Sequence, residues 1–247
     1  MRLDKLLAMM QFGTRNEVKQ LIRQGNVTVD GNRAVSAKQH VDPQTQIVCC
    51  FGKRLRYQKY VYYMLYKPKG CVTARKDNVH DTVMDYIKDS RKDLFPVGRL
   101  DLDTEGLLLI TNDGDLSHRL LSPAKHVKKV YEARIDGLVT SEHIKAFAAG
   151  VDIGDDTLTA PAELTVLEAG EISNVRVAIT EGRYHQIKRM FLAMGRSVVA
   201  LKRTAMGNVK LDDLLAPGEY RELTEQELNE LKGQEDTYAK PDKSRDI

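Results

Sequence analysis

The sequence predicts an α+β protein, in which a small amino-terminal module is followed by a larger domain of mixed strands and helices. Helical periods with capping residues occur near both ends of the chain, and short alternating apolar segments typical of strands lie between them. The 247 residues, 42% of them hydrophobic, suffice for two domains or for one large domain with a small appendage.

The positive charge of the chain is concentrated at its amino end. Residues 1–60 contain 11 lysines and arginines against four acidic residues, a local charge of +7, whereas the remaining chain contains 27 basic and 31 acidic residues. A basic module joined to a nearly neutral body is typical of an arm that binds phosphate groups, although a solvated basic surface gives the same pattern.

The first module begins with two predicted helices. Residues 2–9 have helical character. The second helix is better defined, because Thr14 and Glu17 have the spacing of a capping box and precede a run of apolar residues. Gly25 is expected to end this helix.

Short strands are predicted after these helices. Val27 and Val29 alternate with polar residues and lead into the dipeptide Asp30-Gly31, which is typical of a hairpin turn. Further short strands are expected around Val35, Val41, Ile47 and Val48. Residues 52–59 are basic and without period, and we interpret them as a linker able to contact RNA.

The second region alternates predicted strands with helices. Strands are expected at Val61–Tyr66, Leu107–Thr111, Val130–Ile135 and Val175–Ile179. A helix begins near His185, because apolar residues recur there at i, i+3, i+4 and i+7 and Gly195 follows as a stop signal. A capping box at Thr224 precedes a last helix. Residues 233–247 contain almost no apolar side chain and are expected to form a disordered tail.

The composition argues against several classes of protein. No apolar run approaches the roughly 20 residues of a membrane span, and residues 1–5 carry charge where a secretory signal needs an apolar stretch, so we expect a cytoplasmic protein without a membrane partner. Cys49, Cys50 and Cys71 suit neither a disulfide framework nor a CxxC metal half-site. The histidines lack metal-ligand spacing and no serine lies in a GxSxG motif, so a zinc enzyme or a serine hydrolase is not supported.

An acidic cluster lies directly before the strand predicted at Leu107. It contains the carboxylates of Asp101, Asp103 and Glu105. In an extended backbone Asp101 and Asp103 share one face, and such a pair can serve general acid–base chemistry or bind a metal, although the ligand spacing of a calcium loop is absent. From the residues alone the segment is either an acidic site or an acidic loop that caps a strand.

The start of the helix near His185 collects cations and hydrogen-bond donors. Lys188 and Arg189 add full charge at a helix end whose unpaired amides attract anions. Tyr131 follows the basic run 125–129, so an aromatic ring is expected near phosphate-binding charge. A solvated basic face and a packed core tyrosine are the alternative interpretations of these two features.

Several stretches resemble motifs of the RsuA branch of pseudouridine synthases, in the order found in that family. They are YKPKG at 66–70, VGRLDLDTEGLLLITNDGDLSHRLLSP at 97–123, KKVYEA at 128–133 and EGRYHQIKRMF at 181–191. The stretches RLDKLLA and GNVTVDG resemble the α-L RNA-binding module, which is shared with a ribosomal small-subunit protein. The resemblance covers residues 1 to about 231. Within the branch, YHQIKRM is more similar to the members that act on small-subunit RNA.

The resemblance implies a fold and a reaction. Residues 1–60 would form an α-L module of two helices and a small sheet, and residues 61–232 a mixed, mainly antiparallel sheet with flanking helices. The reaction would convert a uridine to pseudouridine in small-subunit (16S) ribosomal RNA or its assembly intermediate. Because nothing enters or leaves the molecule, no cofactor or metal is expected, and we expect a monomer.

The resemblance also implies roles for particular residues. Asp101 becomes the catalytic aspartate, Lys188 its cationic partner, Tyr131 the ring against the target uracil and Arg99 the residue that fills the gap left by the flipped base. Further residues predicted to contact RNA are Arg2, Lys5, Arg15, Lys19, Arg23, Lys128, Arg183, His185, Gln186 and Arg189.

Three alternative functions remain open on the sequence. A synthase of this branch could act on large-subunit RNA, or the chain could be a non-catalytic RNA chaperone or assembly factor. An aspartate near a sugar also suits a nucleoside hydrolase or glycosidase, which would release the base.

Overall fold

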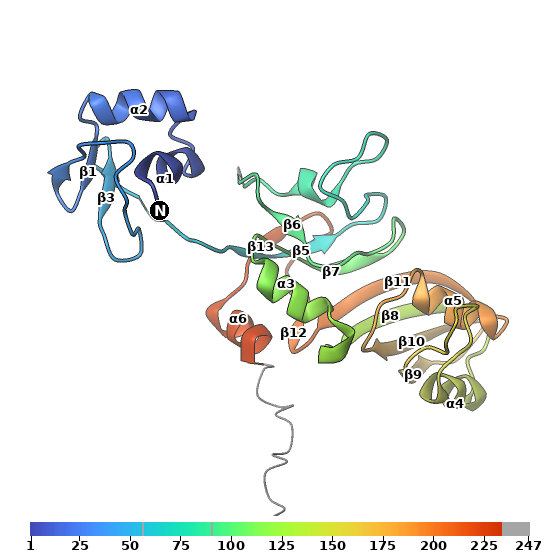
Figure 1. Cartoon of the computed structure of the whole chain (residues 1–247). Helices are drawn as coiled ribbons and strands as arrows, with labels where there is room; N and C mark the ends of the chain where they lie inside the picture. The colour runs from blue at the N-terminus through green and yellow to red at the C-terminus, as the bar shows by residue number, and fades with distance from the viewer. Residues whose placement is uncertain (56, 90, 234–247) are drawn as a thin grey trace, which may run out of the picture. The chain divides into compact units, whose positions relative to one another are not determined.

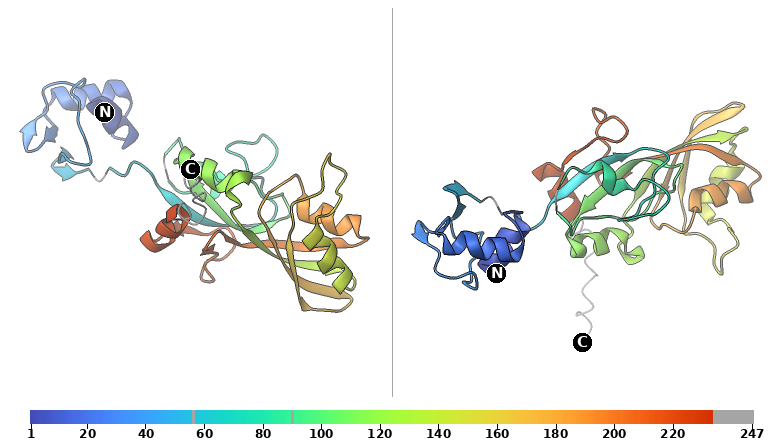
Figure 2. Two further views of the ribbon diagram at one scale, coloured as in Figure 1. Left: turned by 60° about the horizontal axis from the view of Figure 1, so that its bottom comes forward. Right: turned by 90° about the horizontal axis from the view of Figure 1, so that it is seen from above.

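The computed structural model describes residues 1–55, 57–89 and 91–233, and the chain divides into two compact units (Figures 1 and 2). Unit 1 comprises Met1–Tyr60 with Asp89–Lys92, and unit 2 comprises Val61–Lys88 and the chain from Asp93 on. The predicted disordered tail lies, from residue 234 on, outside the described residues. No helix in the described part of the chain is long and apolar enough to cross a membrane.

The described part of unit 1 contains two helices and a small sheet, as predicted, and the sheet has four antiparallel strands. Its elements are α1 (Leu3–Met9), α2 (Arg15–Arg23), β1 (Val27–Val29), β2 (Asn32–Arg33), β3 (Val48–Cys50) and β4 (Lys53–Arg54), with strand order β2-β1-β3-β4. The capping box is confirmed, because the Thr14 amide donates to Glu17 Oε2 at 2.6 Å and the Glu17 amide donates to Thr14 Oγ1 at 3.4 Å. Leu6 of α1, Val18 of α2 and Val27 of β1 are completely buried in one core.

The prediction of two further short strands in unit 1 is wrong. Val35 is 89% exposed and Val41 is buried, and neither lies in a strand. The strands were predicted from the positions of hydrophobic side chains. Strands β2 and β4 instead form because the backbone pairs with the neighbouring strand across a tight turn. Both central residues have positive φ in the predicted Asp30-Gly31 turn and in a second turn at Phe51-Gly52. The second turn places β4 within the segment that we interpreted as a linker.

Unit 2 is built on a mixed, mainly antiparallel sheet, which confirms the expected fold class. Its strands are β5 (Tyr62–Lys67), β6 (Phe95–Pro96), β7 (Glu105–Thr111), β8 (Lys129–Asp136), β9 (Glu163–Glu168), β10 (Ile172–Ile179), β11 (Ser197–Met206), β12 (Val209–Lys210) and β13 (Tyr220–Glu222). The strand order is β13-β5-β7-β11-β8-β10-β9, with β6 also paired to β7 and β12 to β11. The pair β7–β11 is parallel, and the other pairs are antiparallel.

Helices flank this sheet. They are α3 (Gly114–Leu121), α4 (Ser141–Ala149), α5 (Gln186–Ala193) and α6 (Glu225–Lys232), together with short 3₁₀ turns at Val83–Tyr86 and Pro123–Lys125. Helices α4 and α5 lie side by side (Figures 1 and 2), because the buried rings of Phe147 and Phe191 pack with centroids 4.8 Å apart. The predicted capping box at Thr224 is confirmed at the start of α6.

Glycine at position 106 allows the central parallel strands to approach closely. Gly106 opposes Arg203 across the β7–β11 pair and has a φ of +108°. A Cβ atom at this position would overlap the backbone of Arg203, so the site accepts only glycine. The loop that precedes β7, which contains Asp101, is thereby fixed beside β11. Strand β8, on the other side of β11, carries Tyr131.

Candidate active site

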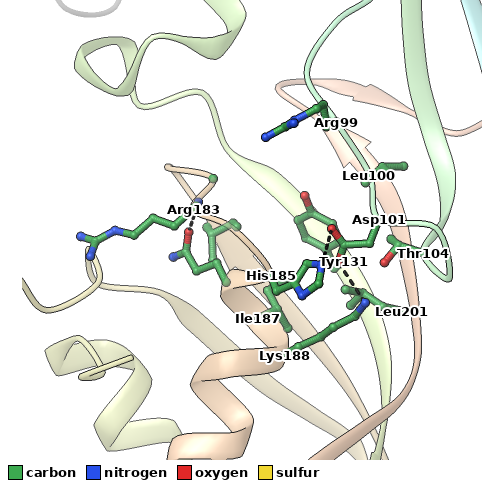
Figure 3. A pocket seen from close by; sticks show the side chains of 13 residues that line it. Arg99, Leu100, Asp101, Thr104, Tyr131, Arg183, His185, Ile187, Lys188 and Leu201 are labelled. Carbon is green, nitrogen blue, oxygen red and sulfur yellow. Dashed lines mark hydrogen bonds and ion pairs between the residues drawn. The ribbon is translucent and has the colours of Figure 1, made fainter. Parts of the chain in front are cut away.

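A pocket in unit 2 brings together residues that are far apart in the sequence. Figure 3 shows Asp101 from the loop before β7, Tyr131 from β8 and Lys188 from α5 around one hollow, with Arg99 and His185 also on its walls. The three residues predicted to be catalytic therefore share one pocket. Their chemical roles stay predictions.

An ion pair links Asp101 to α5. Lys188 Nζ lies 2.9 Å from Asp101 Oδ2 and 2.5 Å from Asp103 Oδ1, and His185 Nε2 lies 3.5 Å from Asp101 Oδ1. Burial acts against the charge of Lys188, but the hydrogen bonds that its ammonium group donates to the two carboxylates outweigh this effect and raise the pKa of the lysine above its ordinary value. Lys188 is thus a permanent cation beside Asp101 at neutral pH.

Asp103 is the more solvent-exposed member of the acidic pair. Its side chain is 70% exposed, compared with 27% for Asp101. Both carboxylates contact the same ammonium group. No group of three or more His, Cys, Asp or Glu residues in the described part of the chain is arranged to hold a metal ion. The geometry therefore favours Asp101 as the carboxylate that a substrate in the pocket would meet.

The last residue of β5 and the segment after it hold the Asp101 loop at the carbonyl groups of three alternate residues. Thr73 Oγ1 donates to Leu100 O at 2.7 Å and accepts from the Leu100 amide at 3.1 Å. The Gly70 amide donates to Leu102 O at 2.8 Å, and Lys67 Nζ donates to Thr104 O at 2.9 Å. The backbone on both sides of Asp101 is therefore fixed to the end of a buried strand.

Lys67 makes this contact from a completely buried position. Its burial lowers the pKa of the ammonium group, and neighbouring acidic groups, including Asp101, act in the opposite direction. Nζ also donates to Pro68 O at 3.0 Å. A buried amine with two carbonyl acceptors fixes local geometry, because breaking those contacts would leave a polar group unsatisfied.

Arg99 is presented by a turn that begins at glycine. Gly98 has a φ of +75°, and a Cβ atom there would lie 2.8 Å from Leu121 Cδ2, so a larger residue would be strained and crowded. The Arg99 side chain is exposed and lines the pocket, and in Figure 3 its guanidinium group points away from Asp101. It is positioned to meet a ligand that enters the pocket.

Tyr131 contributes a largely buried ring to the pocket. The residue is 7% exposed and belongs to the main hydrophobic core of unit 2. Across the sheet it opposes Arg203 on one side and Val177 on the other. Its hydroxyl group has no hydrogen-bond partner among the described residues, so this group remains available to a ligand.

Three other residues predicted to bind RNA are engaged within unit 2. Arg183 donates to Thr157 O at 2.8 Å and to Leu158 O at 2.7 Å. Arg189 donates to Asp155 Oδ1 at 2.6 Å, and Gln186 is only 4% exposed. The two arginines hold the 155–158 loop, and Arg183 and Gln186 also line the pocket. The contact of these three residues with RNA stays a prediction.

Three basic residues of unit 1 form a stripe on α2. Arg15, Lys19 and Arg23 follow at intervals of four residues and so lie on one helical face, where the two arginines are exposed. Lys5 is exposed on α1, whereas Arg2 is engaged with both oxygens of Asp4. The predicted RNA-binding residue Lys128 of unit 2 forms an exposed ion pair with Glu163 at 2.8 Å.

Comparison with known proteins identifies the family. The model of the family "RNA pseudouridylate synthase" matches residues 61–193. The chain belongs to the RNA pseudouridylate synthase family. The match confirms the prediction that the protein is an isomerase that acts on RNA. The S4 domain model matches residues 1–47 and confirms an RNA-binding module at the amino end.

Individual relatives of this pseudouridine synthase agree over nearly the whole chain. The uncharacterized RNA pseudouridine synthase YtzG of Bacillus subtilis is 48% identical, over 94% of this chain and 98% of the relative. The ribosomal small subunit pseudouridine synthase A of Pasteurella multocida is 42% identical, over 92% of this chain and 98% of the relative. A crystal structure of a pseudouridylate synthase, 37% identical, superposes with a TM-score of 0.67 over 94% of this chain and 99% of the other.

Sequence reasoning missed several contacts around the candidate site. It paired Asp103 with Asp101 as a possible acid–base or metal site, but it did not predict that the two carboxylates share Lys188. It did not single out Thr73, whose only sequence signal is its place shortly after the YKPKG motif. It used Tyr184 only as part of the YHQIKRM motif and gave no role to this exposed ring, which lies next to a pocket residue.

Proposed function

We propose that this protein converts a uridine of small-subunit (16S) ribosomal RNA to pseudouridine, with Asp101 as the catalytic residue. The observation that carries the proposal is the 2.9 Å ion pair between Asp101 and Lys188 in the pocket that also contains Tyr131. The small-subunit target is supported by relatives named ribosomal small subunit pseudouridine synthase A, which are about 40% identical to this chain.

The reaction suits a single ionised carboxylate. The bond between uracil N1 and ribose C1′ breaks, the ring turns, and C5 bonds to C1′. The hydrogen on C5 leaves as a proton and N1 takes up a proton, so uridine and pseudouridine have the same composition. Asp101 can attack the sugar or uracil ring, stabilise positive charge that develops on the ribose, or remove a ribose proton. Each route requires the ionised form, which the Lys188 ammonium group favours.

The target uridine must leave its stack to reach this pocket. Extrusion of a base costs a few kcal/mol and is easiest in loops and irregular helices. Arg99 is exposed at the pocket and would occupy the space that the base leaves, while Tyr131 would contact the uracil ring and assist removal of the C5 proton. Phosphate contacts of unit 1 would offset part of the cost of extrusion.

The test is to map the product on unmodified ribosomal RNA. The wild-type protein is incubated with small-subunit and large-subunit transcripts and with small-subunit assembly particles, and pseudouridines are located by chemical derivatisation and primer extension. We expect one new pseudouridine in small-subunit RNA. A product confined to large-subunit RNA would overturn the target, release of free uracil would indicate a hydrolase, and no change in any RNA would indicate a non-catalytic binding protein.

A further inference from the structure

An exposed aromatic pair lies at the edge of the pocket. Tyr184 is 71% exposed, and its ring stacks on that of His185 with centroids 3.9 Å apart and an interplanar angle of 17°. His185 lines the pocket and contacts Asp101 at 3.5 Å, so the stacked rings reach from the candidate catalytic carboxylate to solvent. Tyr184 has no role in the proposed reaction.

The backbone fixes this pair in place. Neighbouring side chains of an extended chain point in opposite directions. His185 instead has a φ of +49°, in the left-handed region that non-glycine residues rarely adopt, and this conformation lets the two rings lie parallel. Arg189 Nη1 donates to Tyr184 O at 3.2 Å, and the Arg189 amide donates to His185 O at 2.9 Å. Both residues are therefore attached to the first turn of α5.

We propose that Tyr184, backed by His185, is a stacking platform for the base of a nucleotide next to the target uridine. His185 covers one face of the Tyr184 ring, and the high exposure of Tyr184 leaves the rest of it open. When a uridine occupies the pocket, the bases on either side of it lie at the pocket's edge. An aromatic face accepts any base by stacking, and no charged partner is needed. This proposal rests on the proposed function.

Kinetic analysis of two variants tests the platform. Tyr184→Leu keeps an apolar side chain without a ring, and Tyr184→Phe keeps the ring without the hydroxyl. Pseudouridine formation on small-subunit transcripts is followed by tritium release from uridine labelled at C5. For Tyr184→Leu we expect KM to rise roughly 5- to 150-fold, equivalent to about 1–3 kcal/mol per stacked base, with kcat nearly unchanged. Tyr184→Phe should behave as wild type.

Leu192→Ala is the matched control, because Leu192 is an exposed apolar residue on α5, the helix that follows Tyr184, and does not line the pocket. It should leave both constants unchanged. An unchanged KM in Tyr184→Leu, or a loss confined to kcat, would overturn the platform. Failure of the wild-type protein to form pseudouridine in any RNA would instead refute the proposed function, so the two failures are distinguishable.

A fluorescence measurement detects the stacking directly. Once the modified uridine is mapped, 2-aminopurine is placed on its 5′ or its 3′ side in otherwise identical transcripts. Wild type and Tyr184→Phe should quench the fluorescence at one of the two positions, and Tyr184→Leu should not. Absence of quenching at both positions with the wild-type protein would overturn the proposal.

Discussion

The two units use positive charge in opposite ways. In unit 1, Arg15 and Arg23 are exposed on one face of α2. In unit 2, Lys67 and Lys129 are buried with backbone carbonyl partners, and Lys188 is paired with two carboxylates. Exposed cations attract phosphates and are weakened by salt, whereas buried or paired cations fix geometry. We therefore expect unit 1 to govern affinity for RNA and unit 2 to govern the rate of reaction.

Among the positive charges of the two units, the largest effect is expected from the paired cation. Lys188→Met removes the positive charge beside Asp101 and leaves two carboxylates without their counter-ion. We expect kcat to fall roughly 10²- to 10³-fold, as when a single charge-stabilising group is removed from an active site, with little change in RNA affinity. Tritium release measures kcat, and Lys210→Met, at an exposed lysine of β12, is the control. A raised KM with normal kcat would contradict the assignment of RNA affinity to unit 1 and of reaction rate to unit 2.

Removal of the exposed cations should change affinity instead. The triple variant Arg15→Ala, Lys19→Ala and Arg23→Ala is expected to bind small-subunit RNA about tenfold more weakly, with kcat at saturation unchanged. The slope of log affinity against log salt should become shallower by about 0.7–0.9 for each phosphate that the variant no longer neutralises. Filter binding at several salt concentrations measures both quantities.

The matched control removes three exposed lysines from unit 2. These residues are Lys88, Lys145 and Lys210. Their replacement by alanine should leave the salt slope nearly unchanged. An equal loss of affinity in the control would contradict a special role for the α2 face.

A smaller effect on rate is expected from the support of the Asp101 loop. Thr73→Val removes the hydroxyl that both donates to and accepts from the Leu100 backbone. The loss of such a bond is worth about 1–2 kcal/mol, so we expect kcat to fall roughly five- to thirtyfold while KM stays the same. Thr73→Ser should restore the rate. Thr165→Val, at an exposed position of β9, controls for general destabilisation, and a wild-type kcat in Thr73→Val would show that the bond does not position Asp101.

The smallest effect on activity is expected at Lys129, where replacement should change only the stability of the fold. Burial, with the charge of Arg203 adding to it, lowers the pKa of Lys129 to about 8 from the ordinary value of 10.5. Between these two values the unfolded chain holds a proton that the folded chain has lost, so wild-type stability should rise as pH increases through this window. Lys129→Met should be more stable at neutral pH by up to about 3 kcal/mol and should lack this rise.

Urea denaturation across the alkaline range measures the effect. Lys145→Met, at an exposed lysine of α4, should keep the wild-type dependence on pH. If the stability of wild type and of Lys129→Met changed with pH in the same way, the lowered pKa of Lys129 would be contradicted.

Local patterns predicted the elements whose signals are local. The capping boxes at Thr14 and Thr224 and the apolar period of α5 each involve residues within a few positions, and all three helices are confirmed. Strand β11 escaped prediction, because its centre contains Lys202 and Arg203 and reads as polar. Arg203 is nevertheless only 2% exposed, and Nε donates to Leu107 O at 2.7 Å. Its partner is almost a hundred residues away in the sequence, beyond any local pattern.

In the candidate site, too, the sequence predicted the local features but not the contacts between distant residues. The acidic cluster and the basic start of α5 were visible as separate features, but their residues alone gave no reason to bring Asp101 and Lys188 together. That pairing came from the resemblance to a family. The contacts of Thr73 and the stacking of Tyr184 on His185 depend on backbone turns, at Gly98 and at His185 itself, that no pattern of residue types specifies.

The most direct test compares the two aspartates that share Lys188. Asp101→Asn and Asp103→Asn remove equal charge from neighbouring positions, but only Asp101 lines the pocket. In single-turnover reactions with enzyme in excess over small-subunit RNA, we expect Asp101→Asn to bind the RNA and form no pseudouridine, while Asp103→Asn retains most of its activity. Product formation by Asp101→Asn, or equal loss of activity in both variants, would contradict the assignment of catalysis to Asp101.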